Sequence, residues 1–360
     1  MRLPKVSVTV VTFNSERYIR RCLRAVFQQQ EVDLEVVVVD NASTDRTRAI
    51  LREFGEIRAI FLPVNAGFAE AQNRGIDATT APWVLTLNPD VLLRPGFLRA
   101  LLDTGESDPG AGAVCGKLLS IGPGFQPLPE PRIDSTGIYF TPAMRHFDRG
   151  WHEPDGRYSE GPEYVFGASA AAALFRREMI DDVAIDGQFF DPEFFVYRED
   201  ADVAWRAQLL GWNTIYTPAA EAFHVRTVTP FNRRSLPSFI NMHSVKNRFL
   251  MRIKNATGGI CRRFFLPMTA RDLIVLGGSI FWEPSSMKAW WHVARSLPRA
   301  LRQRRIIMSR RRVADEDLAH WFNEIPVARP VGRIRIAASA ATRYPARAVV
   351  HDQGLTEPTA

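Results

Sequence analysis

Acidic side chains gather in two segments where carboxylates could do chemistry. The segment YREDADVAW (197–205) brings Glu199, Asp200 and Asp202 together, and the segment LTLNPDV (85–91) places Asp90 directly after an apolar run. Acids at the start of a helix favour the helix dipole, which alone explains the first cluster. That explanation does not cover the aromatic run FFDPEFFVY that leads into it. A carboxylate near a substrate hydroxyl can instead accept its proton as a general base.

Apolar strands and amphipathic helices alternate through the first part of the chain. We expect strands at 6–13, 34–43, 57–62 and 83–87, and helices at 15–29, 44–54 and 68–79. Thr44 is the expected cap of the second helix. This alternation predicts an α/β fold with a mainly parallel sheet covered on both faces. Ligands bind such sheets beyond the carboxyl ends of the strands, where Asp40, Asn41, Asn88 and Asp90 fall.

The sequence also disfavours several other classes of protein. A dinucleotide-binding oxidoreductase needs GxGxxG after the first strand, and the segment TFNSERY (12–18) contains no glycine. Cys22, Cys115 and Cys261 lie far apart without zinc or disulfide spacing, so we expect a reducing cytosol. The N-terminal apolar run turns polar at Asn14, which is typical of a first strand rather than a secretory signal.

A strongly basic segment follows in the second part. Between Met251 and Arg312 there are fourteen Lys and Arg against two acids, fourteen minus two or +12, whereas the whole chain carries +7. Its longest uncharged apolar stretch, Leu273 to Trp282, is about half of the roughly twenty residues that span a bilayer. Tryptophans and arginines together favour an interfacial helix on an anionic membrane. Nucleic-acid binding also suits an arginine cluster and is the less favoured interpretation.

Five blocks of sequence, in this order, resemble glycosyltransferase family 2, especially its rhamnosyltransferase-like branch. The resemblance spans roughly residues 6 to 226 and implies a GT-A fold that transfers a sugar from a nucleoside diphosphate with inversion. We therefore expect a catalytic domain at 1–228, a basic helical extension at 229–312 and a partly irregular tail at 313–360. The blocks are VSVTVVTFNSERYIRRCLRAV, VVVVDNASTDRT, NAGFAEAQNRGI, LTLNPDV and FFDPEFFVYREDADVAWRAQLLGW.

The resemblance assigns roles to individual residues of these blocks. Asp200 matches the general base, with Glu199 beside it as the other candidate. Asp90 matches a divalent-cation ligand at a DxD position whose first acid is Asn88 here, and His224 matches a later metal or diphosphate ligand; Mg²⁺ or Mn²⁺ is the implied cofactor. Residues of the donor nucleotide pocket are Thr12, Asn14, Asp40, Asn41, Asn65, Gly67, Asn73 and Asn88. Residues of the acceptor or diphosphate side are Asp134, Asp202 and Arg206. Two roles are open for Arg206, which either pairs with an acid of its own helix or contacts the diphosphate.

The expected reaction is transfer of a sugar, best L-rhamnose from dTDP-rhamnose, to a hydroxyl of a lipid-linked or polysaccharide acceptor. The basic segment suggests work at the cytoplasmic face of the cell membrane, as a peripheral protein. The alternative is a nucleotide-binding module with a nucleic-acid-binding C-terminal region and no transferase activity. A processive synthase is disfavoured, because Gln303 is followed by RRII and no QxxRW block is present.

Overall fold

The computed structural model describes residues 3–226, 238–282 and 286–331. All four predicted strands and all three predicted helices of the first part are present. The strands are β1 (Lys5–Thr12), β2 (Asp33–Asp40), β3 (Ile57–Phe61) and β4 (Trp83–Leu87). The helices between them are α1 (Ile19–Phe27), α2 (Thr47–Leu51) and α3 (Phe68–Asp77).

Two details of the prediction are wrong. Thr44 does not cap α2, because its backbone N–H donates to Asn14 Oδ1 at 2.8 Å and the helix starts only at Thr47. The N–H of Thr47 is instead bound by Asp45 Oδ1 at 2.9 Å. β2 ends at Asp40 rather than at residue 43, because Ala42 has a φ of 64° and leaves the extended conformation.

Eleven strands of the described residues form the central sheet, in the order β14-β11-β13-β6-β12-β4-β1-β2-β3, with β5 on β13 and β7 on β6. The pairs β1–β2, β1–β4, β2–β3 and β6–β13 are parallel, whereas β12 runs antiparallel between β4 and β6. The mainly parallel sheet is thus confirmed. Its other strands are β5 (Val91–Leu93), β6 (Ala111–Ser120), β7 (Ile133–Ser135), β11 (Glu163–Val165), β12 (Ala172–Arg176), β13 (Asn213–His224) and β14 (Arg329–Pro330).

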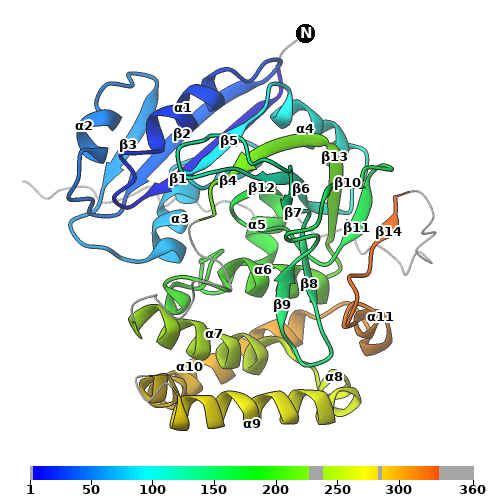
Figure 1. Cartoon of the computed structure of the whole chain (residues 1–360). Coiled ribbons are helices and arrows are strands. Elements are labelled where there is room, and N and C mark those ends of the chain that lie inside the picture. Colours follow the sequence, from blue (N-terminus) through cyan, green and yellow to red (C-terminus); the bar gives the residue numbers. More distant parts are fainter. Residues whose placement is uncertain (1–2, 227–237, 283–285, 332–360) are drawn as a thin grey trace, which may run out of the picture.

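Helices cover both faces of the sheet (Figure 1). On one face, α1 and α4 (Phe97–Glu106) bury an apolar cluster that includes Leu23 and Leu101. On the other face lie α3, α5 (Arg177–Val183) and α6 (Glu199–Leu209), with Met179 and Trp205 in a second cluster. A hairpin of β8 (Ile138–Phe140) and β9 (His146–Asp148) extends from the sheet past α6, and β10 (Asp155–Tyr158) follows it.

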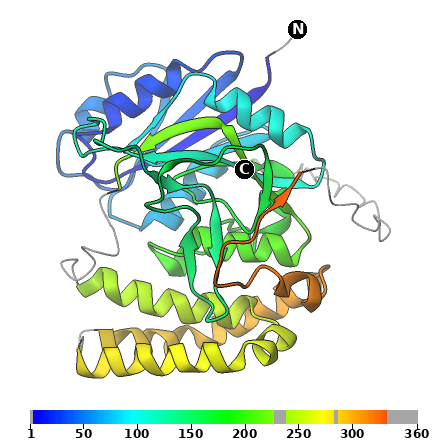
Figure 2. The same ribbon diagram turned by 45° about the vertical axis from the view of Figure 1, so that its right-hand side comes forward.

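The C-terminal region adds a further layer of helices beneath α6 (Figures 1 and 2). α7 (Ser238–Asn255) packs on α6 and on α10 (Met287–Arg310), and α9 (Phe265–Phe281) is outermost. Two short helices, α8 (Gly258–Arg263) and α11 (Asp315–Ala319), complete the layer. The division at residue 228 stays a prediction, and residues 227–237 and 332–360 lie outside the described part of the chain.

Candidate active site

A cavity of about 800 Å³ lies where β4 and β13 end. The sheet contributes Asn88 and Asp90 after β4 and His224 at the end of β13. The first residues of α6, Glu199 and Asp200, face the same cavity. The structure therefore brings together acids that are more than a hundred residues apart in sequence. The C-terminal helices complete the wall with Ile240, Asn241, Ser244, Val245 and Arg248 of α7 and Arg271 and Val275 of α9.

An unusual backbone delivers the two acids to this cavity. Phe195, Tyr197 and Arg198 all have positive φ values, of 61°, 67° and 72°, which non-glycine residues rarely adopt. The turn is held from outside the segment, because the Arg198 guanidinium donates to the Ser244 carbonyl at 3.1 Å and contacts His146 Nδ1 at 2.8 Å. Strained backbone of this kind persists where the surroundings over-determine it. In this protein the strained turn ends where α6 begins, at Glu199, and it directs the N-terminus of α6 toward the cavity.

Glu199 and Asp200 are neighbouring carboxyl groups in a poorly solvated place. Burial and the neighbouring Asp200 carboxylate raise the pKa of Glu199, and among the described residues its Oε2 has no hydrogen-bond partner. Burial and the charge of Asp148 raise the pKa of Asp200 to about 6. Backbone N–H groups of Ala170 and Ala201 donate to Asp200 at 3.4 and 2.7 Å and oppose that rise. A carboxyl group that titrates near neutral pH is suited to general base catalysis.

A chain of charged residues continues from Asp90 below the cavity. His224 Nε2 lies 3.4 Å from Asp90 Oδ1, and its Nδ1 contacts Asp134 Oδ2 at 2.7 Å. Arg226 bonds Asp134 at 2.6 Å and Asp148 at 2.7 Å. Burial alone would lower the pKa of His224, but Asp134 and Asp90 raise it to about 10. Burial would raise the pKa of Asp134, yet His224 and Arg226 lower it to about 2.

This geometry bears on the predicted metal ligands. Within the described residues, no three His, Cys, Asp or Glu side chains converge as a ready-made metal site. Asp90 and Asn88 do line the cavity, and Mg²⁺ sites commonly combine one or two carboxylates with substrate phosphates. The residues thus fit a cation held jointly with a diphosphate. His224 ligates a metal only when it is neutral, so the raised pKa favours an imidazolium beside Asp90, and its ligand role stays a prediction.

The residues predicted for the donor nucleotide lie together at the ends of β1 and β2. Asp40 is fully buried and accepts hydrogen bonds from Thr12 Oγ1 at 3.2 Å and the Ser43 N–H at 3.1 Å. Arg48 Nε also donates to Asp40 Oδ2 at 2.6 Å, a contact that could not be predicted from the sequence. Asn14, with a φ of 50°, joins this loop through Thr44. Hydrogen bonds that a nucleotide base would donate to Asp40 stay a prediction.

The other donor-pocket residues organise the loop before α3. Asn41 Nδ2 donates to Asn65 Oδ1 at 2.8 Å, and this oxygen also accepts from the N–H of Gly67 at 3.0 Å. Gly67 has a φ of 87°, and an added Cβ would lie 2.6 Å from the Phe195 ring. Glycine is thus required because this loop meets the turn before α6. The close approach to the donor that was predicted for Gly67 is not needed to explain it. The loop and the catalytic segment are packed directly together.

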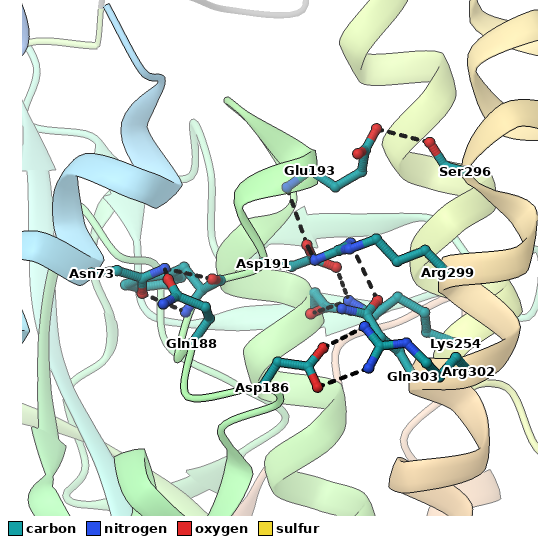
Figure 3. A network of polar contacts seen from close by, with 12 residues as sticks. Asn73, Asp186, Gln188, Asp191, Glu193, Lys254, Ser296, Arg299, Arg302 and Gln303 are labelled. Carbon is teal, nitrogen blue, oxygen red and sulfur yellow. Dashed lines mark hydrogen bonds and ion pairs between the residues drawn. The ribbon is translucent and has the colours of Figure 1, made fainter.

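Asn73 fastens α3 to the loop after α5. Its Nδ2 donates to Gln188 Oε1 at 2.6 Å and to the Phe190 carbonyl at 2.7 Å, and its Oδ1 accepts from the Phe190 N–H at 2.9 Å. Figure 3 shows this contact beside the polar network that joins residues 186–193 to α7 and α10. Because the Asn73 amide group already makes these three hydrogen bonds within the protein, its geometry does not support the prediction that Asn73 binds the donor.

Asp202 and Arg206 form an internal network rather than a wall of the cavity. They pair along α6 at 3.0 Å, and both side chains are buried. Arg206 also donates to the Phe189 carbonyl at 2.6 Å, whereas Asp202 contacts Lys254 of α7 at 3.0 Å. Of the two roles considered for Arg206, the structure shows the intrahelical pair. The prediction of an acceptor or diphosphate contact for these two residues is therefore corrected to a packing role.

Sequence reasoning missed Asp148, Arg198 and Arg226, all of which line the cavity. Arg226 lies two residues beyond His224, but a single arginine after a strand carries no pattern of its own. Asp148 belongs to a three-residue strand of the β8–β9 hairpin, which is too short for a periodic signal. Asp134, predicted for the acceptor side, lies beneath the cavity and orients His224 and Arg226.

Comparisons with known proteins agree with this fold. Residues 7–184 match the family model for glycosyl transferase family 2. The N-acetylglucosaminyl-diphospho-decaprenol L-rhamnosyltransferase of Mycobacterium tuberculosis is 28% identical over 236 residues, which covers 60% of this chain and 75% of that protein. The succinoglycan biosynthesis protein ExoO of Rhizobium meliloti is 33% identical over 108 residues, covering 29% and 31%.

Solved structures resemble the chain at the level of the fold. GalNAc-T7, solved with UDP, GalNAc and Mn²⁺, matches with a TM-score of 0.57 at 13% identity, covering 70% of this chain and 48% of that one. Residues 1–349 of Staphylococcus aureus TarS match with a TM-score of 0.51 at 18% identity, covering 85% and 83%. The fold and the acid-lined cavity thus define a GT-A glycosyltransferase. Over residues 7–184 the chain belongs to glycosyl transferase family 2, and it is similar to an L-rhamnosyltransferase.

Proposed function

We propose that this enzyme transfers L-rhamnose from dTDP-rhamnose, with inversion at the anomeric carbon, to a hydroxyl of a lipid-linked acceptor. The observation that carries the proposal is the pair of buried carboxyl groups, Glu199 and Asp200, facing Asp90 and Asn88 across one cavity. The choice of sugar and acceptor is supported by the name of the Mycobacterium tuberculosis relative.

Asp200 is the better general base of the pair. Burial and the adjacent Asp200 carboxylate raise the pKa of Glu199, whereas backbone N–H groups of Ala170 and Ala201 stabilise the ionised form of Asp200, so Glu199 is the acid that holds a proton more readily. Asp200 is then the ionised carboxylate, and backbone N–H groups hold its orientation. It removes the proton from the attacking hydroxyl while the donor diphosphate departs toward Asn88 and Asp90. A divalent cation, Mg²⁺ or Mn²⁺, bound there would neutralise the charge on the leaving diphosphate.

A donor screen tests this proposal. Thermal shift and donor hydrolysis are measured with dTDP-rhamnose, UDP-N-acetylglucosamine and GDP-mannose, each with Mg²⁺, Mn²⁺ or EDTA. We expect dTDP-rhamnose with a divalent cation to give the largest shift and the only turnover. Turnover of another nucleotide sugar would overturn the sugar assignment alone. Retained anomeric configuration in the product would overturn inversion, and full activity in EDTA would overturn the metal requirement.

The packing of the basic segment speaks against the nucleic-acid alternative. Many of its arginines are paired with acids of the catalytic part, as Arg299 with Asp191 at 2.7 Å and Arg302 with Asp186 at 2.7 Å. Arg312 likewise pairs with Asp182 at 2.8 Å. Nucleic-acid binding depends on cations free to replace counterions at phosphates. Several positive charges of the basic segment instead form ion pairs that hold the C-terminal helices against the catalytic part.

We infer that the outer face of α9 and the neighbouring part of α10 rest on an anionic membrane. Among the described residues, no helix is both long and apolar enough to cross a bilayer. Yet large apolar side chains are exposed along these helices, and Arg262, Arg263, Lys288 and Arg295 are exposed near them. Apolar insertion with peripheral cations suits the cytoplasmic surface of an anionic bilayer. The exposed apolar residues are Phe265, Leu266, Leu273, Ile274, Ile280, Phe281, Trp282, Met287, Trp291, Leu297 and Leu301.

Liposome sedimentation tests the membrane inference without truncating the packed helices. The double variant Leu266→Ser/Leu273→Ser removes side chains that are 77% and 65% exposed, so the fold should survive. We expect it to lose binding to phosphatidylglycerol liposomes, while Leu3→Ser, which removes a residue 53% exposed that precedes β1 and lies outside the C-terminal helices, should bind normally. Binding of the parent should weaken as salt rises. Equal binding by all three proteins would refute the inference.

A further inference from the structure

Acidic and basic side chains both line the cavity, and they come from different elements. Asp90 and Asp200 come from the sheet and the start of α6, whereas three arginines come from the elements beneath. Arg145 immediately precedes β9 in the hairpin, Arg248 belongs to α7 and Arg271 to α9. These elements lie next to one another below the sheet in both views (Figures 1 and 2).

Arg248 is the most deeply placed of the three. Its side chain is 5% exposed, and its Nη2 donates to the Ala143 carbonyl at 2.8 Å. Among the described residues its Nε, which is buried, has no hydrogen-bond partner. Burial lowers the pKa of Arg248 to about 10; Asp272 opposes this shift, and the positive charges of Arg252, Arg271 and Arg145 add to it. A buried guanidinium with spare donors is costly unless an anion compensates it.

The nearby acid is already committed to another residue. Both Asp272 oxygens contact Arg252, at 2.8 and 2.6 Å, in a two-pronged pair. Arg248 reaches Asp272 only at 3.6 Å. Arg271, the cavity-lining neighbour of Asp272, also has a buried Nε without a partner among the described residues. Asp272 therefore balances only part of the positive charge of Arg248, Arg252 and Arg271.

We propose that Arg145, Arg248 and Arg271 bind the phosphate groups that link the acceptor sugar to its lipid. This inference rests on the proposed transferase function and adds the residues that recognise the acceptor. Guanidinium groups present planar N–H donors that match phosphate oxygens, and three of them suit a diphosphate better than a single carboxylate. The donor diphosphate has a separate place, beside Asn88 and Asp90.

The position of α9 favours a lipid-linked phosphate over a free one. Arg271 and Val275, one helical turn apart, line the cavity, whereas Leu273 between them is 65% exposed on the surface assigned to the membrane. Ile240 and Val245 of α7 add apolar side chains to the same wall. A phosphate held by the arginines would thus have apolar surface beside it and the bilayer on the other side of α9.

Calorimetry on the full chain tests the site with geranyl diphosphate and inorganic pyrophosphate as probes. EDTA is present, so that a cation near Asp90 cannot hold the probe. We expect geranyl diphosphate to bind more tightly than pyrophosphate, and Arg271→Gln to weaken it by about tenfold or more, the value of a lost charge-assisted hydrogen bond. Arg305→Gln, which removes an exposed arginine of α10 outside the cavity, should bind like the parent. Arg248→Lys, which keeps the charge of the buried residue, should lose less affinity than Arg248→Gln.

Three results would overturn the proposal. Unchanged geranyl diphosphate affinity in Arg271→Gln would remove the site. An equal loss of dTDP affinity, measured with Mg²⁺, would assign the arginines to the donor instead. Competition by glucuronate as strong as that by pyrophosphate would indicate a carboxylate ligand. Failure of the transferase function is distinguishable, because the donor screen would then show no turnover while probe binding in EDTA stayed as measured.

Discussion

Lys254 of α7 contacts the Asp202 carboxylate of α6 at 3.0 Å, with both side chains almost completely buried. Lys254 also contacts Asp191 at 2.6 Å, in the network that Figure 3 shows between residues 186–193 and the C-terminal helices. The basic extension is thus packed through interior charges onto the helix that carries Asp200. Positioning of the base and folding of the extension are therefore linked.

The first prediction concerns this buried contact. Lys254→Met should lower the free energy of unfolding by about 3–5 kcal/mol, because the buried Asp191 and Asp202 carboxylates would lose the cation that they share and keep only Arg299 and Arg206. Urea denaturation measures the loss. Arg302→Gln is the matched control, since its pair with Asp186 is exposed and such pairs contribute about 1 kcal/mol or less. Equal losses in the two variants would show that the buried network does not stabilise the fold.

The second prediction separates the two acids at the start of α6. Asp200→Asn keeps the size and most hydrogen bonds of the side chain but cannot accept a proton. Turnover should fall by about 10² to 10⁴ while donor affinity is retained. Glu199→Gln should cost much less, because burial and the Asp200 carboxylate raise the pKa of Glu199 and disfavour its ionised form. Kinetics with dTDP-rhamnose and donor titration measure both effects. An inactive Glu199→Gln beside an active Asp200→Asn would move the base by one residue.

The third prediction is a pH dependence. The base must be ionised, and burial with the charge of Asp148 raises the pKa of Asp200 to about 6. The rate should therefore be full above this value and fall as the pH drops through about 6. Asp148→Asn should move the fall to lower pH, because it removes a negative charge that disfavours ionisation. A profile that is flat between pH 5 and 8, measured at saturating donor, would be incompatible with Asp200 as the base.

The fourth prediction tests the diphosphate end of the cavity. Asp90→Ala should weaken metal-dependent donor binding by at least about tenfold, since even outer partners of metal ligands are worth that much. Asn88→Asp should strengthen Mn²⁺ binding, because a carboxylate is a better ligand than an amide. Calorimetric titration of Mn²⁺ in the presence of dTDP measures both. Unchanged metal affinity in Asp90→Ala would place the cation elsewhere.

The elements of the first half and the identity of the main acids could be predicted from the amino-acid sequence alone. Apolar runs and helical periodicity depend on neighbouring residues, so β1 to β4 and α1 to α3 could be predicted, apart from ends set by local turns such as Ala42. Asp90 and Asp200 were also predictable, because each lies in a distinctive block that resembles the family. The basic composition of the C-terminal region was equally plain from the chain alone.

Which polar residues face the cavity and which ones stabilise the fold became clear from the folded structure and not from the sequence. Asn73, Asp202 and Arg206 lie in the same sequence blocks as residues that line the cavity. Their side chains are nevertheless engaged in hydrogen bonds and ion pairs inside the fold. Arg226 and Arg248 reach the cavity from segments without a motif. Burial, ionisation and hydrogen bonding depend on long-range neighbours, which local sequence patterns do not encode. The same arginine-rich helices could therefore serve as a solvated surface or, as here, as the wall of a site.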